Sequence, residues 1–209
     1  MSVTTPQLAS AVETFADRIH ASREELTELD SAIGDADHGI NMDRGMTAVR
    51  EILPGLRDGD AGALFKQVGM KLISTVGGAS GPLYGTFFLR MGTTLGGTRE
   101  IDARQLAEAL RAGLTGVVSL GKAALDDKTM VDAMTPAIEA LEAGSSGDLG
   151  PALASAASAA AAGRDRITPL VARKGRASYL GERSANHQDP GATSATLLFE
   201  SLRDALGAA

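Results

Sequence analysis

AGALFKQVGMKLISTVGGASGPLYGTFFLRM, residues 61–91, contains two apolar stripes with helical spacing on either side of a glycine pair. The first stripe extends from Ala61 to Ile73, and Gly77-Gly78 then interrupts the pattern. The second extends from Pro82 to Met91, and proline is well tolerated in the first turn of a helix. Apolar residues that recur every three or four positions form one face of an amphipathic helix. This stretch therefore predicts two helices separated by a short break.

Helical periodicity continues in both directions along the chain. Leu8, Val12, Phe15 and Ile19 follow a helix cap and a first-turn proline, and they predict a helix that runs towards Leu29. Further helices are predicted over residues 42–53, 103–120, 129–141, 151–162 and beyond, and 192–206. With about eight helices and no convincing strand pair, the predicted fold class is all-α. Alanine-rich faces let helices approach closely, which favours a compact bundle.

Composition restricts the class of protein. No linker rich in proline or serine divides the 209 residues, so we expect a single domain over residues 1–209. A formal net charge of −6 argues against broad electrostatic capture of nucleic acid or of an anionic membrane. The absence of cysteine excludes disulfides and zinc-thiolate sites. Because neither a secretory leader nor a run of roughly 20 apolar residues occurs, we expect a cytoplasmic protein.

Four irregular segments rich in glycine, aspartate or arginine interrupt the predicted helices. They cover residues 30–41, 77–82, 121–130 and 173–191. In an up-and-down bundle, segments of this kind can meet at one end. We therefore expect these four segments to carry the chemistry of the protein.

The first segment, DSAIGDADHGIN, concentrates the carboxylates of Asp30, Asp35 and Asp37. Clustered carboxylates repel one another unless cations neutralise them or they stay solvated. Hard oxygen ligands favour Mg²⁺ or Ca²⁺, but a calcium EF-hand is excluded because Ile40 and Met46 stand where its loop needs glycine and glutamate. Magnesium is commonly held by a few carboxylates together with substrate phosphates. Two interpretations stay open at this point: a magnesium site, or an ordinary turn and helix cap.

The second and third segments contain features that suit a phosphate. GGASG, residues 77–81, presents consecutive backbone N–H groups ahead of a helix N-terminus, which attracts anions, although the same residues also suit a turn between helices. Residues 116–123, GVVSLGKA, resemble a Walker A loop, but Ala123 stands where a serine or threonine must bind Mg²⁺. A P-loop fold is therefore excluded, and Gly121 stays available for close approach to a ligand.

The last segment contains a basic run in an otherwise acidic protein. Arg173, Lys174 and Arg176 are able to bind phosphate oxygens, or they form a solvated helix end. His38 adjoins the aspartates and His187 lies in the last segment. Either histidine is a candidate to orient a ligand, or is a hydrogen-bonded loop residue.

Taken together, the four segments resemble the nucleotide-binding L subunit of bacterial dihydroxyacetone kinase. The resemblance rests on DSAIGDADHGINMDRG, VGGASGPLYGTFF, GKAALDDKTM and ARKGRASYLGERSANHQDPGATS, and it extends over essentially the whole chain. It implies an eight-helix antiparallel barrel with a nucleotide, ADP or ATP, bound at one end. It also favours the magnesium interpretation, because Asp30, Asp35 and Asp37 match the family's ligands for two Mg²⁺ ions that bridge the nucleotide phosphates.

The resemblance further implies nucleotide contacts from every irregular segment. The residues expected to border the nucleotide are His38, Gly39, Ile40 and Asn41 in the first segment, Ala79 and Ser80 beside the phosphates, Gly121 and Met130 around the adenosine, and Asp189, Pro190 and Gly191 in the last loop. Arg176 matches a phosphate-side contact, to which we assign the catalytic neutralisation of charge. Lys174 is a further candidate in the same run.

In the kinase that this resemblance implies, a separate K subunit binds dihydroxyacetone and the L subunit supplies the γ-phosphoryl group. Phosphoryl transfer depends on charge neutralisation and in-line positioning more than on a protein nucleophile. In one type of this kinase, ADP leaves after transfer and ATP replaces it. In the other type, ADP stays bound and is rephosphorylated by the M subunit of a phosphoenolpyruvate-dependent phosphotransferase system. A chain without a fused acceptor domain fits the second type, which we predict.

Three alternatives stay open from the sequence. The chain is an ATP-dependent split kinase subunit that serves dihydroxyacetone or another short ketose, a freestanding small-molecule kinase, or a nonenzymatic nucleotide-binding regulator. A freestanding kinase would need an acceptor site and a base within this chain, and we find no motif for either.

Overall fold

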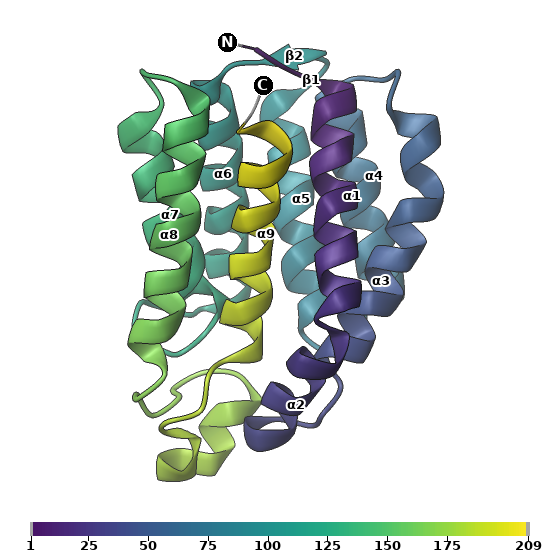
Figure 1. Ribbon diagram of the computed structural model, residues 1–209. Helices are drawn as coiled ribbons and strands as arrows, with labels where there is room; N and C mark the ends of the chain where they lie inside the picture. Colours follow the sequence, from purple (N-terminus) through teal and green to yellow (C-terminus); the bar gives the residue numbers. More distant parts are fainter. Residues whose placement is uncertain (1, 208–209) are drawn as a thin grey trace.

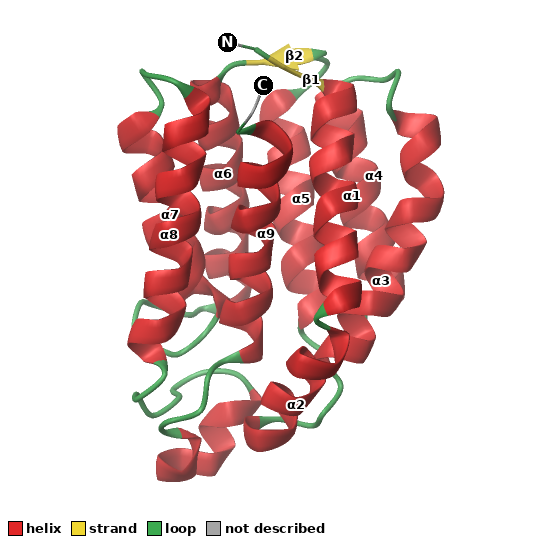
Figure 2. Ribbon diagram, viewed as in Figure 1, coloured by secondary structure: helices red, strands yellow, loops and turns green. Residues whose placement is uncertain are grey.

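The computed structural model describes residues 2–207, which are almost entirely helical (Figures 1 and 2). The helices are α1 (Thr5–Ala21), α2 (Arg23–Ile33), α3 (His38–Ile52), α4 (Ala61–Thr75), α5 (Ser80–Leu95), α6 (Ala103–Gly121), α7 (Met130–Gly144), α8 (Leu149–Ile167) and α9 (Pro190–Leu206). Two 3₁₀ segments are η1 (Leu53–Leu56) and η2 (Arg176–Ser184). Within residues 2–207, no helix combines the length and the apolar character that crossing a bilayer requires.

Eight of the described helices form a closed antiparallel ring (Figure 1). From α3 to α9 each helix packs against the next one in sequence, α1 packs against α3, and the ring closes where α9 lies beside α1. The remaining helix, α2, lies across one end of the ring. The predicted all-α class and the eight-helix antiparallel arrangement are therefore confirmed for the described part of the chain.

A short strand pair at the other end of the ring was not predicted. Strands β1 (Val3–Thr4) and β2 (Glu100–Ile101) pair antiparallel, with Val3 opposite Ile101. Two residues are too few to show the alternating pattern by which a strand is recognised, so the expectation of no strand pair is wrong here. The pair links the start of α1 to the connection that precedes α6, and it lies far from α2 (Figure 2).

The first predicted helix is also interrupted. Instead of continuing towards Leu29, the chain breaks at Ser22, where φ is −96° and ψ is 11°. Helix α2 then changes direction, which buries Leu26 and brings Asp30 to the end of the barrel. The apolar spacing continues across the break, and for this reason the sequence pattern did not reveal it.

Glycines allow α4 and α5 to approach each other closely. A Cβ atom at Gly69 would lie 2.7 Å from the carbonyl oxygen of Gly85, and one at Gly92 would lie 2.6 Å from the carbonyl oxygen of Gly62. Each backbone thus occupies the space where the other would carry a side chain. The two helices that support the GGASG turn are therefore fixed to each other by direct backbone packing.

Gly69→Ala is expected to lower the free energy of unfolding by about 1–3 kcal/mol, because the helices must separate to admit the methyl group. This loss should exceed the gain in helix propensity that alanine provides, about 1 kcal/mol. Urea unfolding of the two proteins measures the difference. Gly55→Ala is the matched control, since a Cβ atom there would meet nothing within 4 Å. If both variants are as stable as the parent protein, the α4–α5 contact is not the constraint described here.

Candidate functional site

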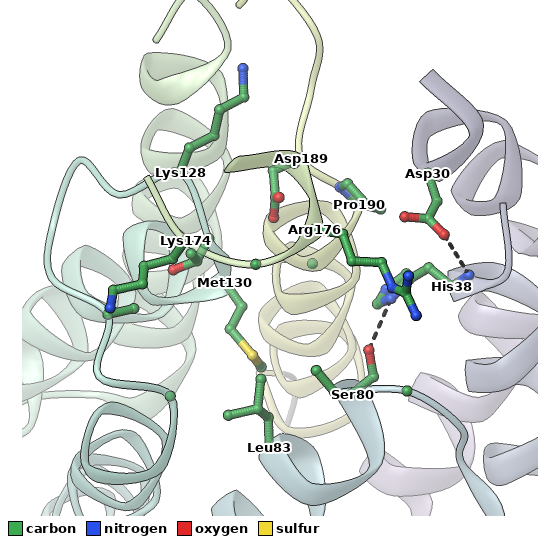
Figure 3. Close-up of a pocket in the computed structure, with 18 of the residues that line it drawn as sticks. Asp30, His38, Ser80, Leu83, Lys128, Met130, Lys174, Arg176, Asp189 and Pro190 are labelled. Atoms are coloured by element: carbon green, nitrogen blue, oxygen red, sulfur yellow. Dashed lines mark hydrogen bonds between the residues drawn. The ribbon is translucent and has the colours of Figure 1, made fainter. Parts of the chain in front are cut away.

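The four irregular segments meet at the end of the barrel opposite β1 and β2 (Figures 1 and 3). They enclose a cavity of about 270 Å³. Its lining includes most of the residues predicted from the sequence: Asp30, Asp35, Asp37, His38, Ala79, Ser80, Gly121, Met130, Lys174, Arg176, Asp189, Pro190 and Gly191. The up-and-down topology thus places side chains from distant parts of the sequence around one space.

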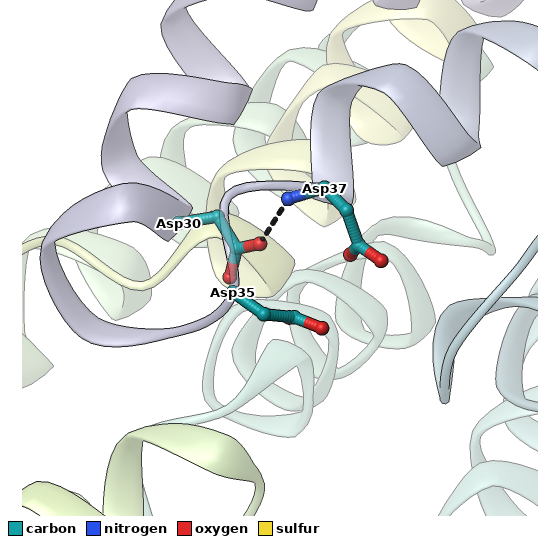
Figure 4. A group of neighbouring side chains, drawn as sticks. All are labelled: Asp30, Asp35 and Asp37. Atoms are coloured by element: carbon teal, nitrogen blue, oxygen red, sulfur yellow. Dashed lines mark hydrogen bonds between the residues drawn. The ribbon is translucent and has the colours of Figure 1, made fainter.

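Asp30, Asp35 and Asp37 form an acidic corner of this cavity (Figure 4). One carboxylate oxygen of each lies within 4.8 Å of the others. Asp30 Oδ2 accepts hydrogen bonds from the backbone N–H groups of Asp37, at 2.8 Å, and His38, at 3.1 Å. Arg176 Nη2 lies 3.0 Å from Asp35 Oδ2. Because three carboxylates face one guanidinium, negative charge is in excess, and these convergent oxygen donors fit a hard divalent cation.

A chain of hydrogen bonds connects the cavity to the interior of the barrel. Ser80 Oγ lies 3.1 Å from His38 Nδ1, and His38 Nε2 lies 2.9 Å from Ser194 Oγ. Ser194 Oγ also lies 2.8 Å from the hydroxyl of Tyr84, which is fully buried. Burial lowers the pKa of His38 to about 4, against the opposing charges of the nearby carboxylates. His38 is therefore neutral near pH 7, with both ring nitrogens engaged.

The start of α5 offers anion-binding groups to the same cavity. Gly78 takes a φ of +64°, which glycine adopts without strain, and Ser80 is the first residue of the helix. Backbone N–H groups in the first turn of a helix lack partners within the helix, and the helix dipole favours negative charge there. This geometry agrees with the phosphate-binding interpretation of the GGASG turn.

An apolar part of the lining was largely missed by the sequence analysis. It includes Ile33, Leu83, Tyr84, Val117, Ala123, Val131 and Ala177. Along the sequence these side chains have the same spacing as core residues, because a helix face that covers the end of a cavity is also apolar. Lys128, Thr129 and Gly175 also line the cavity and were not predicted. Together with Met130, the apolar residues form a wall suited to a flat, uncharged ring system.

Three predicted residues do not line the cavity. Gly39 packs against α2, and a Cβ atom there would lie 2.0 Å from the carbonyl oxygen of Arg23. Ile40 is 44% exposed. Asn41 is buried and accepts a hydrogen bond from Arg44 Nη2 at 2.7 Å. These residues shape the start of α3 rather than the wall of the cavity, and their contact with a nucleotide stays a prediction.

Two further candidates from the last segment also lie outside the lining. His187 is exposed, and Arg173 contributes its backbone N–H to the carbonyl oxygen of Asp127 at 3.0 Å. The segment that resembles a Walker A loop is helical as far as Gly121, in agreement with the exclusion of a P-loop. Of the basic run, Lys174 and Arg176 are thus the residues that reach the cavity.

Asp189 contributes a buried carboxyl group to the cavity at the start of α9. Its Oδ2 accepts a hydrogen bond from the backbone N–H of Ala192 at 2.7 Å, and so caps the helix. Burial raises the pKa of Asp189 to about 7, although the Ala192 hydrogen bond and the charge of Lys128 oppose the shift. The carboxyl group therefore changes its charge near neutral pH.

Asp189 should make the stability of the protein depend on pH. Since the pKa is higher in the folded chain, the stabilising contribution is complete below about pH 4 and is lost as the pH rises through about 7. Asp189→Asn keeps a capping oxygen but cannot ionise. Between about pH 5 and pH 8, the parent protein should lose on the order of 2 kcal/mol relative to this variant in urea unfolding without nucleotide. Parallel pH profiles for the two proteins would contradict the prediction.

Comparison with known proteins assigns the family. A family model described as the DAK2 domain matches residues 32–204. The chain belongs to the DAK2 domain family. It is 45% identical over 204 residues to the PEP-dependent dihydroxyacetone kinase, ADP-binding subunit DhaL, of Escherichia coli (strain K12), with 97% of each chain covered.

Two further comparisons support the DAK2 assignment. The chain is 42% identical over 188 residues to the PTS-dependent dihydroxyacetone kinase, ADP-binding subunit DhaL, of Lactococcus lactis, with 90% of this chain and 91% of that protein covered. The crystal structure of the dihydroxyacetone kinase from C. freundii in complex with AMP-PNP and Mg²⁺ superimposes with a TM-score of 0.74 at 28% identity. That match covers 94% of this chain and 33% of the other. The resemblance inferred from the four segments is therefore confirmed.

Proposed function

We propose that this DAK2 domain protein is the nucleotide-binding subunit of a dihydroxyacetone kinase, and that it transfers the γ-phosphoryl group of magnesium-bound ATP to dihydroxyacetone. The observation that carries the proposal is the lining of the cavity. A cluster of three carboxylates, a helix N-terminus, an arginine and an apolar wall all border the same space. The relatives at 42–45% identity are named as ADP-binding subunits of such kinases, which supports it.

Each part of the cavity has a role in this proposal. Asp30, Asp35 and Asp37 would hold two Mg²⁺ ions, whose positive charge would neutralise that of the phosphates. The start of α5, at Ala79 and Ser80, binds phosphate oxygens. Arg176 lies beside the aspartates and places a permanent positive charge on the phosphate side.

The remaining lining residues hold the nucleoside. Gly121 and Met130 surround the adenosine, where the apolar wall receives the base. The loop of Asp189, Pro190 and Gly191 closes over the nucleotide at the start of α9. We treat residues 1–209 as one domain, and the continuous hydrophobic core shared by the ring helices supports this.

The acceptor is held by a separate K subunit in this proposal. His38 is a weak base, because burial lowers its pKa to about 4, and it therefore does not supply the base that a freestanding kinase would need. The bound ADP is rephosphorylated in place by a phosphotransferase M subunit. Support for this donor comes from relatives that are named as PEP-dependent or PTS-dependent.

Exchange of labelled ADP tests the donor. The protein is loaded with labelled ADP and Mg²⁺, then supplied with the phosphotransferase components and phosphoenolpyruvate. We expect slow exchange with free nucleotide and conversion of the label to ATP while it is still bound. If bound ADP exchanges freely and ATP alone sustains many cycles with the K subunit, the protein is an ATP-dependent split kinase. If the nucleotide binds but no phosphoryl transfer occurs with the K subunit, the protein is a nonenzymatic regulator.

A further inference from the structure

Lys128 forms a polar centre that the proposed chemistry does not use. Its side chain is fully buried, and its backbone has a φ of +65°. The ammonium donates to three backbone carbonyl oxygens: Ser184 at 2.7 Å, Thr168 at 2.8 Å and Leu170 at 2.9 Å. An ammonium has three N–H donors, so all of them are paired. In Figure 3 the side chain leads away from the other labelled residues, and the ammonium is therefore not a ligand of the cavity.

The three carbonyl groups belong to the segment that carries the basic residues of the cavity. Thr168 and Leu170 follow the end of α8, and Ser184 is the last residue of η2. The hydrogen bonds of Lys128 therefore join the loop before α7 to both sides of Arg176. One more link joins the same two loops: the backbone N–H of Arg173 donates to the carbonyl oxygen of Asp127 at 3.0 Å.

Apolar packing of this segment is limited to a few side chains. Its buried apolar side chains, Ala172 and Ala177, form a small cluster with Ile33. Two leucines are only partly buried: Leu180 packs against this cluster, and Leu170 packs against the barrel core. Because two alanines and two partly buried leucines bury less apolar area than a ring helix does, hydrogen bonds contribute a large share to the position of this segment. The Arg176 side chain is 64% exposed. Its position therefore depends on its ion pair with Asp35 and on the backbone that carries it.

A buried ammonium is costly unless it is fully hydrogen-bonded, and here main-chain dipoles alone provide the bonds. We propose that Lys128 is a positioning residue, which holds residues 168–184 in place so that Arg176 reaches the phosphate side of the cavity. This inference rests on the proposed function, because it concerns binding of the nucleotide phosphates. It predicts that loss of the ammonium affects phosphate-dependent binding more than binding of the nucleoside.

Lys128→Gly is the most informative variant, because it removes the ammonium while glycine accepts the positive φ without strain. Binding of ADP with Mg²⁺ and binding of adenosine are measured by calorimetry, with circular dichroism to verify that the helices are intact. We expect ADP binding to weaken about tenfold or more, and adenosine binding to change much less. The matched control is Lys122→Gly, which removes an exposed lysine with a φ of +53° in the same loop. It should bind both ligands like the parent protein.

Two further measurements separate positioning from general stability. Adding Lys128→Gly to Arg176→Ala should weaken ADP binding little beyond Arg176→Ala alone, because both changes remove the same contact. Butylammonium, which has the four carbons and the ammonium of the removed side chain, should restore ADP binding to Lys128→Gly by occupying the site between the three carbonyl groups. Additive losses in the double variant would overturn the proposal, and so would equal losses of ADP and adenosine binding.

Failure of this inference is distinguishable from failure of the proposed function. If the parent protein does not bind ADP with Mg²⁺, the proposed function is wrong. If the parent protein binds ADP and folded Lys128→Gly binds it equally well, the positioning role alone is wrong. If neither Lys128→Gly nor Lys128→Met folds, Lys128 is required for folding itself, and the positioning role is likewise overturned.

Discussion

Asp37→Asn is expected to weaken magnesium-dependent ADP binding by about a hundredfold or more. Removing only an outer-shell partner of a bound metal already lowers metal affinity by up to about a hundredfold. The backbone N–H of Asp37 donates to Asp30 and is unchanged in the variant, so the turn should persist. Asp35 is a less specific target, because its carboxylate also pairs with Arg176. Calorimetry with ADP, in Mg²⁺ and in excess chelator, measures the effect directly.

Thermal melts provide a second measurement of the same site. ADP should raise the melting temperature of the parent protein strongly only when Mg²⁺ is present, since the aspartates and the phosphates otherwise repel each other. Without ligands, Asp37→Asn should be at least as stable as the parent protein, because one of three clustered charges is gone. Asp58→Asn, which alters an exposed carboxylate outside the cavity lining, is the control. Tight magnesium-dependent binding by Asp37→Asn would show that the metal assignment is wrong.

The isolated chain, supplied with ATP, Mg²⁺ and dihydroxyacetone, is expected to show less than about a thousandth of the turnover seen when the K subunit is added. The reason is that without the K subunit dihydroxyacetone is free in solution and lacks the positioning on which phosphoryl transfer depends. Formation of dihydroxyacetone phosphate by the ATP-loaded chain in a single turnover measures the rate, because ADP is expected to stay bound after transfer. Binding of ADP by the same preparation shows that the chain is folded and competent. Robust turnover by the chain alone would establish a freestanding kinase instead.

Local features of the site could be predicted because they are encoded over short distances in the sequence. Asp30 lies in the last turn of α2, and Asp35 and Asp37 lie in the short connection to α3, so their convergence needs little from the rest of the fold. Gly77-Gly78 likewise predicted the break before α5, which begins at Ser80, two residues before the predicted start at Pro82. The helices themselves follow from the spacing of apolar residues, which the hydrophobic effect turns into buried faces.

Other features have no local signal. Leu83 and Val117 have the same helical spacing as the core, although both line the cavity. Lys128 stands in the polar stretch DDKT, which by composition suggests a solvated loop. The structure buries this lysine completely, because three carbonyl groups from distant positions surround its ammonium. A composition rule cannot detect a buried charge whose partners are backbone groups elsewhere in the chain.

The sequence by itself determined the helical class, the positions of most helices, the acidic turn and the family resemblance, because each depends on residues that are neighbours along the chain. Tertiary structure alone decided the closure of the ring between α9 and α1, the break at Ser22 and the burial of Lys128. It also decided which helix ends face the cavity. These features depend on contacts between residues far apart in sequence, whose free energies are realised only when all the helices pack together.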